Sequence, residues 1–125
     1  MLPIDIKPVA IVKGRPEDDE GAPLRQVIEV RPEYEECLLR IEEREHLWVL
    51  YWMHELKPAD RGITQVHPRG DGSVPLHGVF AVHSPMRPNP IGMTRVRLIS
   101  REGLQLTVEG LDAFDGSPVI DIKSG

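Results

Sequence analysis

The sequence predicts a mainly β protein, a small antiparallel β-barrel with one short helix. Short apolar runs rich in β-branched residues alternate along the chain with turns that contain Gly and Pro. Residues 104–109 alternate apolar and polar side chains with a period of two, as in a strand with one buried face. A barrel is preferred to a sandwich because a closed sheet leaves no strand edge to protect.

The first half of the chain is expected to supply three strands and the helix. Pro8, inside the first apolar run, marks an edge position or a bulge, because proline cannot donate to a strand ladder. Pro32 suits the first turn of a helix whose apolar face would carry Tyr34, Leu38 and Ile41. The expected elements are a strand at 4–13, an exposed acidic loop at 14–23, a strand at 24–31, a helix from Pro32 to about Ile41, and a buried central strand at 46–55.

The second half alternates short strands with turns. In the strand at 93–100, Val96 and Leu98 alternate with Arg95 and Arg97, so one face is apolar and the other is basic. The expected elements are a turn at 57–62, a short strand at 63–66, a Gly-rich loop at 68–75, and strands at 76–83, 93–100, 104–109 and 119–122.

The stretch from Gly78 to Gly92, GVFAVHSPMRPNPIG, is the part of the chain around which the rest is organised. Its prolines at positions 85, 88 and 90 fix backbone dihedrals and give a stiff, irregular loop. A rigid surface turn is the more common outcome of such a stretch. Arg87 and Asn89 favour a ligand-binding loop, because a stiff backbone holds a guanidinium and an amide in preset positions.

Two further groups of polar residues are candidates for a site. Asp112 and Asp115 flank Ala113–Phe114 in a sharp turn. They either hydrogen-bond their own backbone, the more common use, or accept bonds from a ribose or an amine. His54 ends the central strand, and His83 precedes the prolines at positions 85, 88 and 90, whose loop within Gly78–Gly92 is here called the proline loop. A lone histidine is more often structural than catalytic. No standard catalytic signature or G-x-G-x-x-G pattern occurs, which argues against a Rossmann cofactor site.

Length and composition indicate a single domain, residues 1–125, large enough for a hydrophobic core. No stretch approaches the length that spans a bilayer, and the charged Asp5 and Lys7 argue against a signal peptide. Cys37 is the only cysteine, and its apolar neighbours predict a buried structural thiol. A chain without an internal disulfide fits the reducing cytoplasm, and no Cys/His set has the spacing of a zinc site, so no metal is expected.

The net charge of −5 hides an asymmetry along the chain. Residues 61–101 hold six arginines and one aspartate, a balance of +5, whereas the rest holds nine basic and nineteen acidic residues, a balance of −10. Local charge runs are usually solvated faces. A polarised chain can still present a basic face to an RNA backbone, and on this basis Arg95 and Arg97 are expected to contact RNA phosphates.

Two motifs carry a resemblance to a known family. GVFAVHSPMRPNPIG, followed by GLDAFDGSPVIDIK, resembles the signature of the TsaA/TrmO-like family, also called YaeB-like, and HLWVLYWMH matches its upstream strand. The similarity runs from about Val9 to Lys123. The resemblance implies a small β-barrel that binds S-adenosylmethionine without a Rossmann fold and acts as a homodimer. It also implies methylation of N6 of the threonylcarbamoyl-modified adenosine next to the anticodon in certain tRNAs.

The resemblance also implies site residues, although no catalytic residue is assigned. Arg87, Asn89 and Lys123 match family motif positions and would serve cofactor, RNA or dimer contacts. The basic strand face at Arg95 and Arg97 would receive the anticodon arm of the tRNA. The implied cofactor contacts are His54, Glu55, His83, Met93, Asp112, Ala113, Phe114 and Asp115.

Three features depart from the family pattern. His83 stands where the family usually has Arg, so a permanent charge becomes a titratable one. The family's Pro-Arg-Gln-Pro-Gly segment is missing between the first two strands, although residues 23–26 echo it against the second strand. The family's Asp-Ile-Lys-Pro-Tyr pattern is matched here only as far as Ile122–Lys123, which Ser124–Gly125 follow, and the family's longer C-terminal part is not expected. Two alternatives to a tRNA methyltransferase therefore stay open: a cofactor-binding sensor without RNA catalysis, and a related methyltransferase with another substrate.

Overall fold

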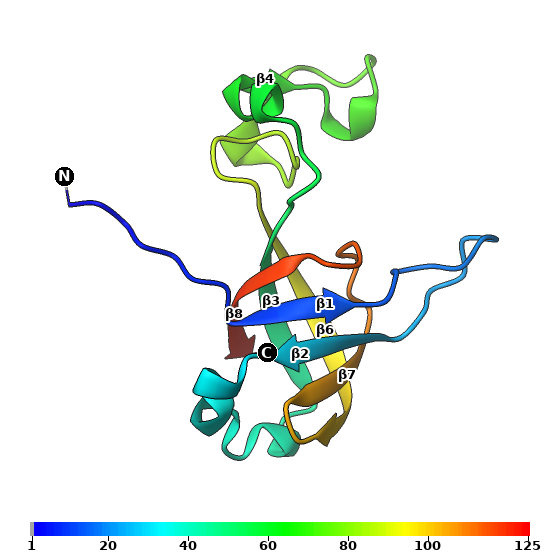
Figure 1. Cartoon of the computed structure of the whole chain (residues 1–125). Coiled ribbons are helices and arrows are strands. Elements are labelled where there is room, and N and C mark those ends of the chain that lie inside the picture. The colour runs from blue at the N-terminus through cyan, green and yellow to red at the C-terminus, as the bar shows by residue number, and fades with distance from the viewer. Residues whose placement is uncertain (1) are drawn as a thin grey trace.

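Six strands close into an antiparallel barrel, which confirms the fold class predicted from the sequence (Figure 1). The computed structural model describes residues 2–125. The strands are β1 (Ala10–Lys13), β2 (Gln26–Val30), β3 (His46–Trp52), β6 (Ile91–Glu102), β7 (Gln105–Glu109) and β8 (Pro118–Ser124). Around the barrel each strand is hydrogen-bonded to the next in the order β1-β2-β7-β6-β3-β8.

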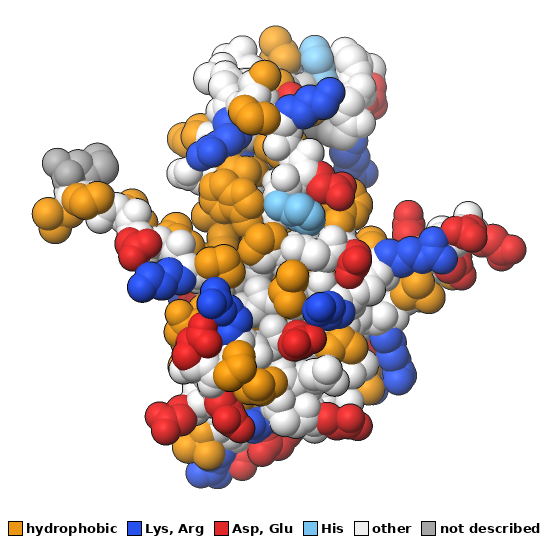
Figure 2. All heavy atoms as spheres, viewed as in Figure 1, with side chains coloured by type: hydrophobic (Ala, Val, Ile, Leu, Met, Phe, Trp, Pro, Cys, Tyr) orange, Lys and Arg blue, Asp and Glu red, His pale blue; other side chains and the backbone are white. Residues whose placement is uncertain are grey.

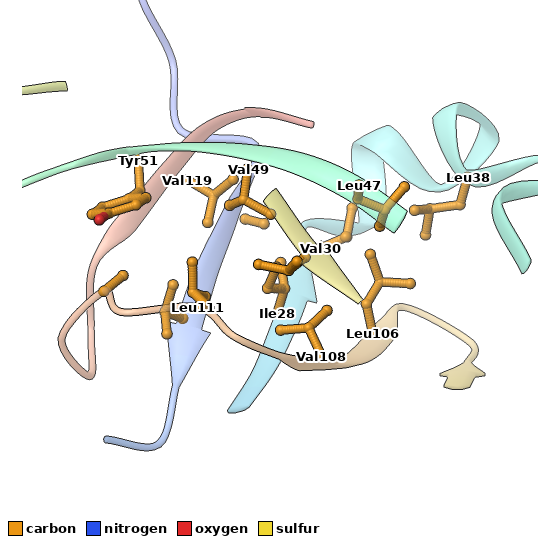
Figure 3. Packing of buried hydrophobic residues seen from close by; sticks show 14 residues of the cluster. Ile28, Val30, Leu38, Leu47, Val49, Tyr51, Leu106, Val108, Leu111 and Val119 are labelled. Carbon is orange, nitrogen blue, oxygen red and sulfur yellow. The ribbon is translucent and has the colours of Figure 1, made fainter. Parts of the chain in front are cut away.

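Alternate residues of the strands fill the barrel. Leu47, Val49 and Tyr51 of β3 are buried, whereas the residues between them are half-buried. Figure 3 shows buried side chains from several strands converging on one another in the interior. The residues that face outward on the same strands are therefore available for surface contacts. The buried strand residues include Val12, Ile28, Leu47, Val49, Val96, Leu106, Val108 and Val119.

Residues 53–90, here called the insertion, leave the barrel after β3 and return to it at β6. In Figure 1 they project from one end of the barrel. At the base, the Met53 N–H donates to the Pro90 carbonyl at 2.8 Å, which holds the two chain crossings side by side. The insertion contains the 3₁₀-helices η3 (Pro58–Gly62), η4 (Pro68–Gly70) and η5 (Val79–Ala81), and the paired two-residue strands β4 (Gln65–Val66) and β5 (His77–Gly78).

Among the strands that are shorter than predicted, three have a clear structural reason. The first begins at Ala10 rather than at residue 4, because within the described chain residues 2–8 pair with no strand. The central strand ends at Trp52 rather than at residue 55, because Pro90 lacks the N–H that would continue the ladder with β6. The strand predicted at 76–83 is reduced to β5, because only the two residues of β4 lie opposite it.

The predicted helix forms as two short 3₁₀-helices. As predicted, Leu38 is buried, and Tyr34 and Ile41 pack against the core. Cys37 is exposed, so the prediction of a buried thiol is wrong. Leu38 points into the barrel, whereas Cys37 and Leu39 on either side of it face solvent, so apolar neighbours in sequence do not share one face here. The two helices are η1 (Pro32–Leu38) and η2 (Ile41–Glu43).

Two other expectations concern membranes and metals. Among residues 2–125, no helix has the length and apolar character needed to cross a membrane. The same residues contain no group of three or more His, Cys, Asp or Glu side chains arranged to hold a metal ion.

Candidate functional site

A cleft of about 980 Å³ lies between the insertion and the barrel. Figure 2 shows hydrophobic side chains gathered where the insertion meets the barrel. Pockets of 300–1,000 Å³ are typical of sites for small molecules and cofactors. The lining comes from the end of β3 and the residues after it, from the proline loop, from the start of β6, and from the turn before β8.

The cleft brings together most of the site residues predicted from the sequence. The cleft is lined by Arg87 and Asn89 and by six of the eight predicted cofactor contacts. Two predicted contacts, His54 and Asp115, are not part of the lining. The six lining contacts are Glu55, His83, Met93, Asp112, Ala113 and Phe114.

Asp112 is held in the cleft by two hydroxyl groups. Tyr51 Oη and Thr94 Oγ1 each donate to Asp112 Oδ1 at 2.8 Å. Within residues 2–125, Asp112 Oδ2 has no hydrogen-bond partner, so this oxygen is available to a ligand. Burial raises the pKa of Tyr51 to about 12, and the neighbouring Asp112 carboxylate adds to the effect, so the phenol stays protonated and remains a donor.

Tyr51 and Thr94 were not among the site residues predicted from the sequence. Tyr51 lies within the apolar run at 46–55, which was predicted only as a buried central strand, and the structure buries its ring. A buried tyrosine hydroxyl needs a hydrogen-bond partner. A tyrosine in a strand predicted to be buried therefore indicates that a polar group lies nearby.

The turn that carries Asp112 is fixed by distant residues. The buried side chain of Gln26 donates from Nε2 to the Ala113 carbonyl at 2.7 Å. Asp115 Oδ1 accepts a bond from the Gly14 N–H at 2.8 Å. The two aspartates therefore bond to groups outside their own turn, unlike the usual pattern of turn aspartates. These bonds hold the turn so that Asp112 and Phe114 line the cleft.

The proline loop is held together by arginine side chains. The Arg87 guanidinium donates to the carbonyls of Val79, Val82 and Ser84, and the last two bonds measure 2.8 and 2.9 Å. Arg87 therefore fixes the wall of the cleft, in addition to lining it.

Arg61 of η3 supports the same loop from outside the cleft. Its Nε donates to the Pro88 carbonyl at 2.7 Å, and its guanidinium carbon lies 5.4 Å from the centre of the Trp52 ring. Nη2 of Arg61 also reaches Asn89 Oδ1 at 3.5 Å. These contacts join the insertion to the end of β3.

A second, shallower groove of about 670 Å³ holds the predicted basic face. Arg95 and Arg97 are exposed on β6, whereas Val96 is buried, as the alternation predicted. Glu109 in this groove accepts a contact from Arg25 at 2.9 Å and one from Arg97 at 3.5 Å. The groove is lined by Pro23, Leu24, Arg25, His46, Arg95, Arg97, Glu109 and Gly110.

Lys123 is not brought into either of these surfaces. It lies opposite Trp48 on the β3–β8 ladder and lines a third hollow with residues of η2 and of the segment around it. Its ammonium is 4.0 Å from the Asp121 carboxylate.

Comparison with known proteins shows which family and which proteins this chain resembles. The family model described as the tRNA-methyltransferase O N-terminal domain matches residues 4–124. The crystal structure of TrmO from Pseudomonas aeruginosa superposes with a TM-score of 0.73 at 26% sequence identity. That match covers 99% of this chain and 56% of the TrmO chain.

Three curated relatives differ in how much of their own length is matched. A probable S-adenosyl-L-methionine-binding protein of Methanothermobacter thermautotrophicus is 40% identical, over 98% of this chain and 90% of the relative. One of Archaeoglobus fulgidus is 51% identical over 77% of this chain, which spans 25% of that relative. A mouse tRNA (adenine(37)-N6)-methyltransferase is 38% identical over 71% of this chain, which spans 20% of it.

Proposed function

Because the chain belongs to the family of the tRNA-methyltransferase O N-terminal domain, we propose that it is a methyltransferase that uses S-adenosylmethionine. The proposed acceptor is N6 of the threonylcarbamoyl-modified adenosine next to the anticodon of a tRNA. One observation carries the proposal: six of the residues predicted to contact the cofactor, which span positions 55 to 114 of the sequence, line one cleft. We also propose that residues 1–125 form one domain that holds this site.

The cleft has the size and chemistry that this cofactor requires. Its apolar wall includes Leu50, Met53 and Ile91, and the exposed rings of Phe80 and Phe114 offer flat surfaces to an adenine. The carboxylates of Glu55 and Asp112 suit the ammonium group and the ribose hydroxyls. Asp112 is the better defined of the two acids, since two hydroxyl groups already fix its orientation.

In the proposed reaction the protein mainly orients the reactants and excludes water. The cofactor supplies an electrophilic methyl group on a sulfonium. The proline loop, held by Arg87, forms one wall against which the reactants are fixed. The N6 proton of the acceptor must also leave, and Glu55 and His83 are lining residues whose side chains can accept a proton.

Two measurements on the purified protein test this function. Calorimetry with S-adenosylmethionine should show saturable binding at a single class of site. Incubation with the cofactor and with tRNA that carries the threonylcarbamoyl modification should then add one methyl group to that nucleoside, detected by mass spectrometry. Absence of cofactor binding at millimolar concentration would overturn the proposal as a whole.

A second candidate function is a cofactor-binding module without tRNA methylation. The observation that favours it is the 40% identity to a protein described only as S-adenosyl-L-methionine-binding, over 90% of the relative's length. Such a module would bind the cofactor and leave tRNA unmodified. A related methyltransferase with another substrate would bind the cofactor and transfer its methyl group to a different RNA or molecule. The same nucleoside analysis, applied to total RNA, distinguishes methylation of the tRNA nucleoside from methylation of another RNA.

We further propose that the active form is a homodimer in the cytoplasm, where tRNA is used. A single chain of 125 residues has little surface with which to enclose both a cofactor and an RNA loop. Sedimentation equilibrium at micromolar concentration should give twice the mass of the chain, and a mass near 14.1 kDa would contradict dimerisation.

A further inference from the structure

The outward face of β6 connects the cleft to the basic groove. Met93, Arg95 and Arg97 share this face because side chains of a strand alternate, and all three are exposed. Met93 lines the cleft, and the two arginines line the groove. Successive residues on one face of a strand are about 6.6 Å apart, so the three side chains form a row from one surface to the other.

The segment after β7 runs beside this row. Gly110 lines the groove, and a Cβ placed on it would lie 4.0 Å from the Arg95 carbonyl. Two residues later, Asp112 lines the cleft and is bonded to Thr94 of β6. The groove and the cleft therefore adjoin along two neighbouring antiparallel segments of chain, β6 and the residues that follow β7.

The groove carries an excess of positive charge on a chain whose net charge is −5. It contains Arg25, Arg95 and Arg97 and a single carboxylate, that of Glu109. Arg25 and Arg97 share Glu109, and Arg95 has no ion-pair partner within residues 2–125. Exposed ion pairs contribute little to stability, so folding alone does not account for three arginines around one acid.

We propose that this groove holds the phosphates of a single-stranded RNA segment whose target base enters the adjoining cleft. The inference rests on the proposed function, because it takes the cleft as the site of methyl transfer. Arg25, Arg95 and Arg97 contact phosphates, which fix the position of the strand without reading its sequence. The base turns into the cleft, where Phe80 and Phe114 give two exposed rings, one for the adenine of the cofactor and one for the target base, since unstacked bases bind on aromatic side chains.

Glu109 regulates the strength of this contact. Its carboxylate lies where phosphates would otherwise meet two of the arginines, and it must give up those pairs when RNA binds. Removing its charge should therefore strengthen RNA binding. A variant with a damaged fold would bind RNA more weakly, so tighter binding after the loss of the Glu109 charge could not result from damage to the fold.

The test compares three variants of the whole chain by fluorescence anisotropy with a labelled tRNA transcript at 50 and 200 mM salt. In Arg95→Gln/Arg97→Gln two proposed phosphate contacts are lost. Each contact to a single strand contributes about 0.7 to the salt slope, so the wild-type affinity should fall about sevenfold more between the two salt concentrations than that of the double variant. Glu109→Gln should bind more tightly than wild type.

The matched control is Arg31→Gln/Arg40→Gln. It makes the same change in net charge at two exposed arginines that pair with Glu33 and Glu43 and do not line the groove. This control should keep the wild-type affinity and salt slope. An equal loss in the control would show that only overall charge matters, and an unchanged Arg95→Gln/Arg97→Gln variant or an unchanged Glu109→Gln variant would overturn the assignment of the groove.

Calorimetry with S-adenosylmethionine on the same variants separates this inference from the proposed function. All variants should bind the cofactor as wild type does, because none of the substituted residues lines the cleft. Wild-type protein that binds the cofactor but no tRNA at 50 mM salt would overturn both the groove and the tRNA substrate. Wild-type tRNA binding that the groove variants leave unaltered would overturn the groove alone.

Discussion

Gly92 lies against the ring of Tyr51, so closely that a Cβ at position 92 would be 2.4 Å from the Tyr51 Cζ atom. The two residues face each other across the ladder of β3 and β6. Real Cβ atoms do not approach other heavy atoms this closely, so glycine is needed for the ring to lie where it does. In that position the Tyr51 hydroxyl reaches Asp112, and Gly92 thus determines the orientation of a carboxylate that it does not touch.

Gly92→Ala should therefore damage both the fold and the site. The added methyl group must displace the Tyr51 ring, and such overpacking typically costs about 1–3 kcal/mol of unfolding free energy. Cofactor affinity should fall as well, because Asp112 loses one of its two hydroxyl donors. Urea denaturation and calorimetry measure the two effects. Gly72→Ala is the control, since no atom lies within 4 Å of a Cβ there, and equal stability of the two variants would contradict the packing argument.

The raised pKa of Tyr51 predicts a loss of stability at high pH. The folded state holds the phenolic proton up to a pKa of about 12, whereas the unfolded chain releases it near the ordinary tyrosine pKa of 10.0. This contribution is therefore complete below pH 10 and is lost as the pH rises through 12. A shift of about two pKa units corresponds to roughly 2–3 kcal/mol.

Tyr51→Phe provides the measurement of this effect. The unfolding free energy should decrease more between pH 9 and pH 11.5 in the wild type than in the variant. Other ionising groups contribute equally to both proteins, so the difference between the two decreases reports the Tyr51 hydroxyl. Parallel pH profiles would show that the hydroxyl is not protected from ionisation in the folded protein.

The barrel follows from local patterns that the sequence displays directly. Val96 and Leu98 alternate with Arg95 and Arg97, and the structure buries Val96 and exposes both arginines. Period-two alternation is a property of the strand itself, so the buried and exposed faces can be predicted without knowing the partner strands. The ends of strands depend on those partners, which is why the early end of β3 at Trp52 was not predicted.

The sequence predicted several of the residues that line the cleft but not the contacts that hold them. The proline loop was expected to offer Arg87 to a ligand, whereas its guanidinium is bonded to three carbonyls of the loop. The bond between Tyr51 and Asp112 joins residues 61 positions apart. It depends on the register of β3 against β6 and on the turn before β8, and neither is encoded in a local pattern.

Asp112 and Asp115 should differ in their effect on cofactor binding. Asp112→Asn should weaken the binding of S-adenosylmethionine about ten- to a hundredfold, because hydrogen bonds to charged groups are worth about 1.5–3 kcal/mol. Asp115→Asn makes the same change of charge outside the cleft lining, at a residue that holds the Gly14 N–H. It should alter stability more than affinity. Calorimetry on both variants decides the matter, and similar losses of affinity would remove Asp112 from the proposed contacts.

Arg87 should be required for the shape of the proline loop. Its fork of donors bonds to three carbonyl groups at once, and the single ammonium of Arg87→Lys cannot reproduce that geometry. We expect faster amide hydrogen exchange across residues 79–90, unchanged exchange in the barrel strands, and weaker cofactor binding, since this loop lines the cleft. Arg69→Lys is the matched control, because Arg69 lies in the same insertion and does not line the cleft. Exchange rates in Arg87→Lys that match those of the control would mean that the prolines alone hold the loop, and the wall of the cleft would then be independent of Arg87.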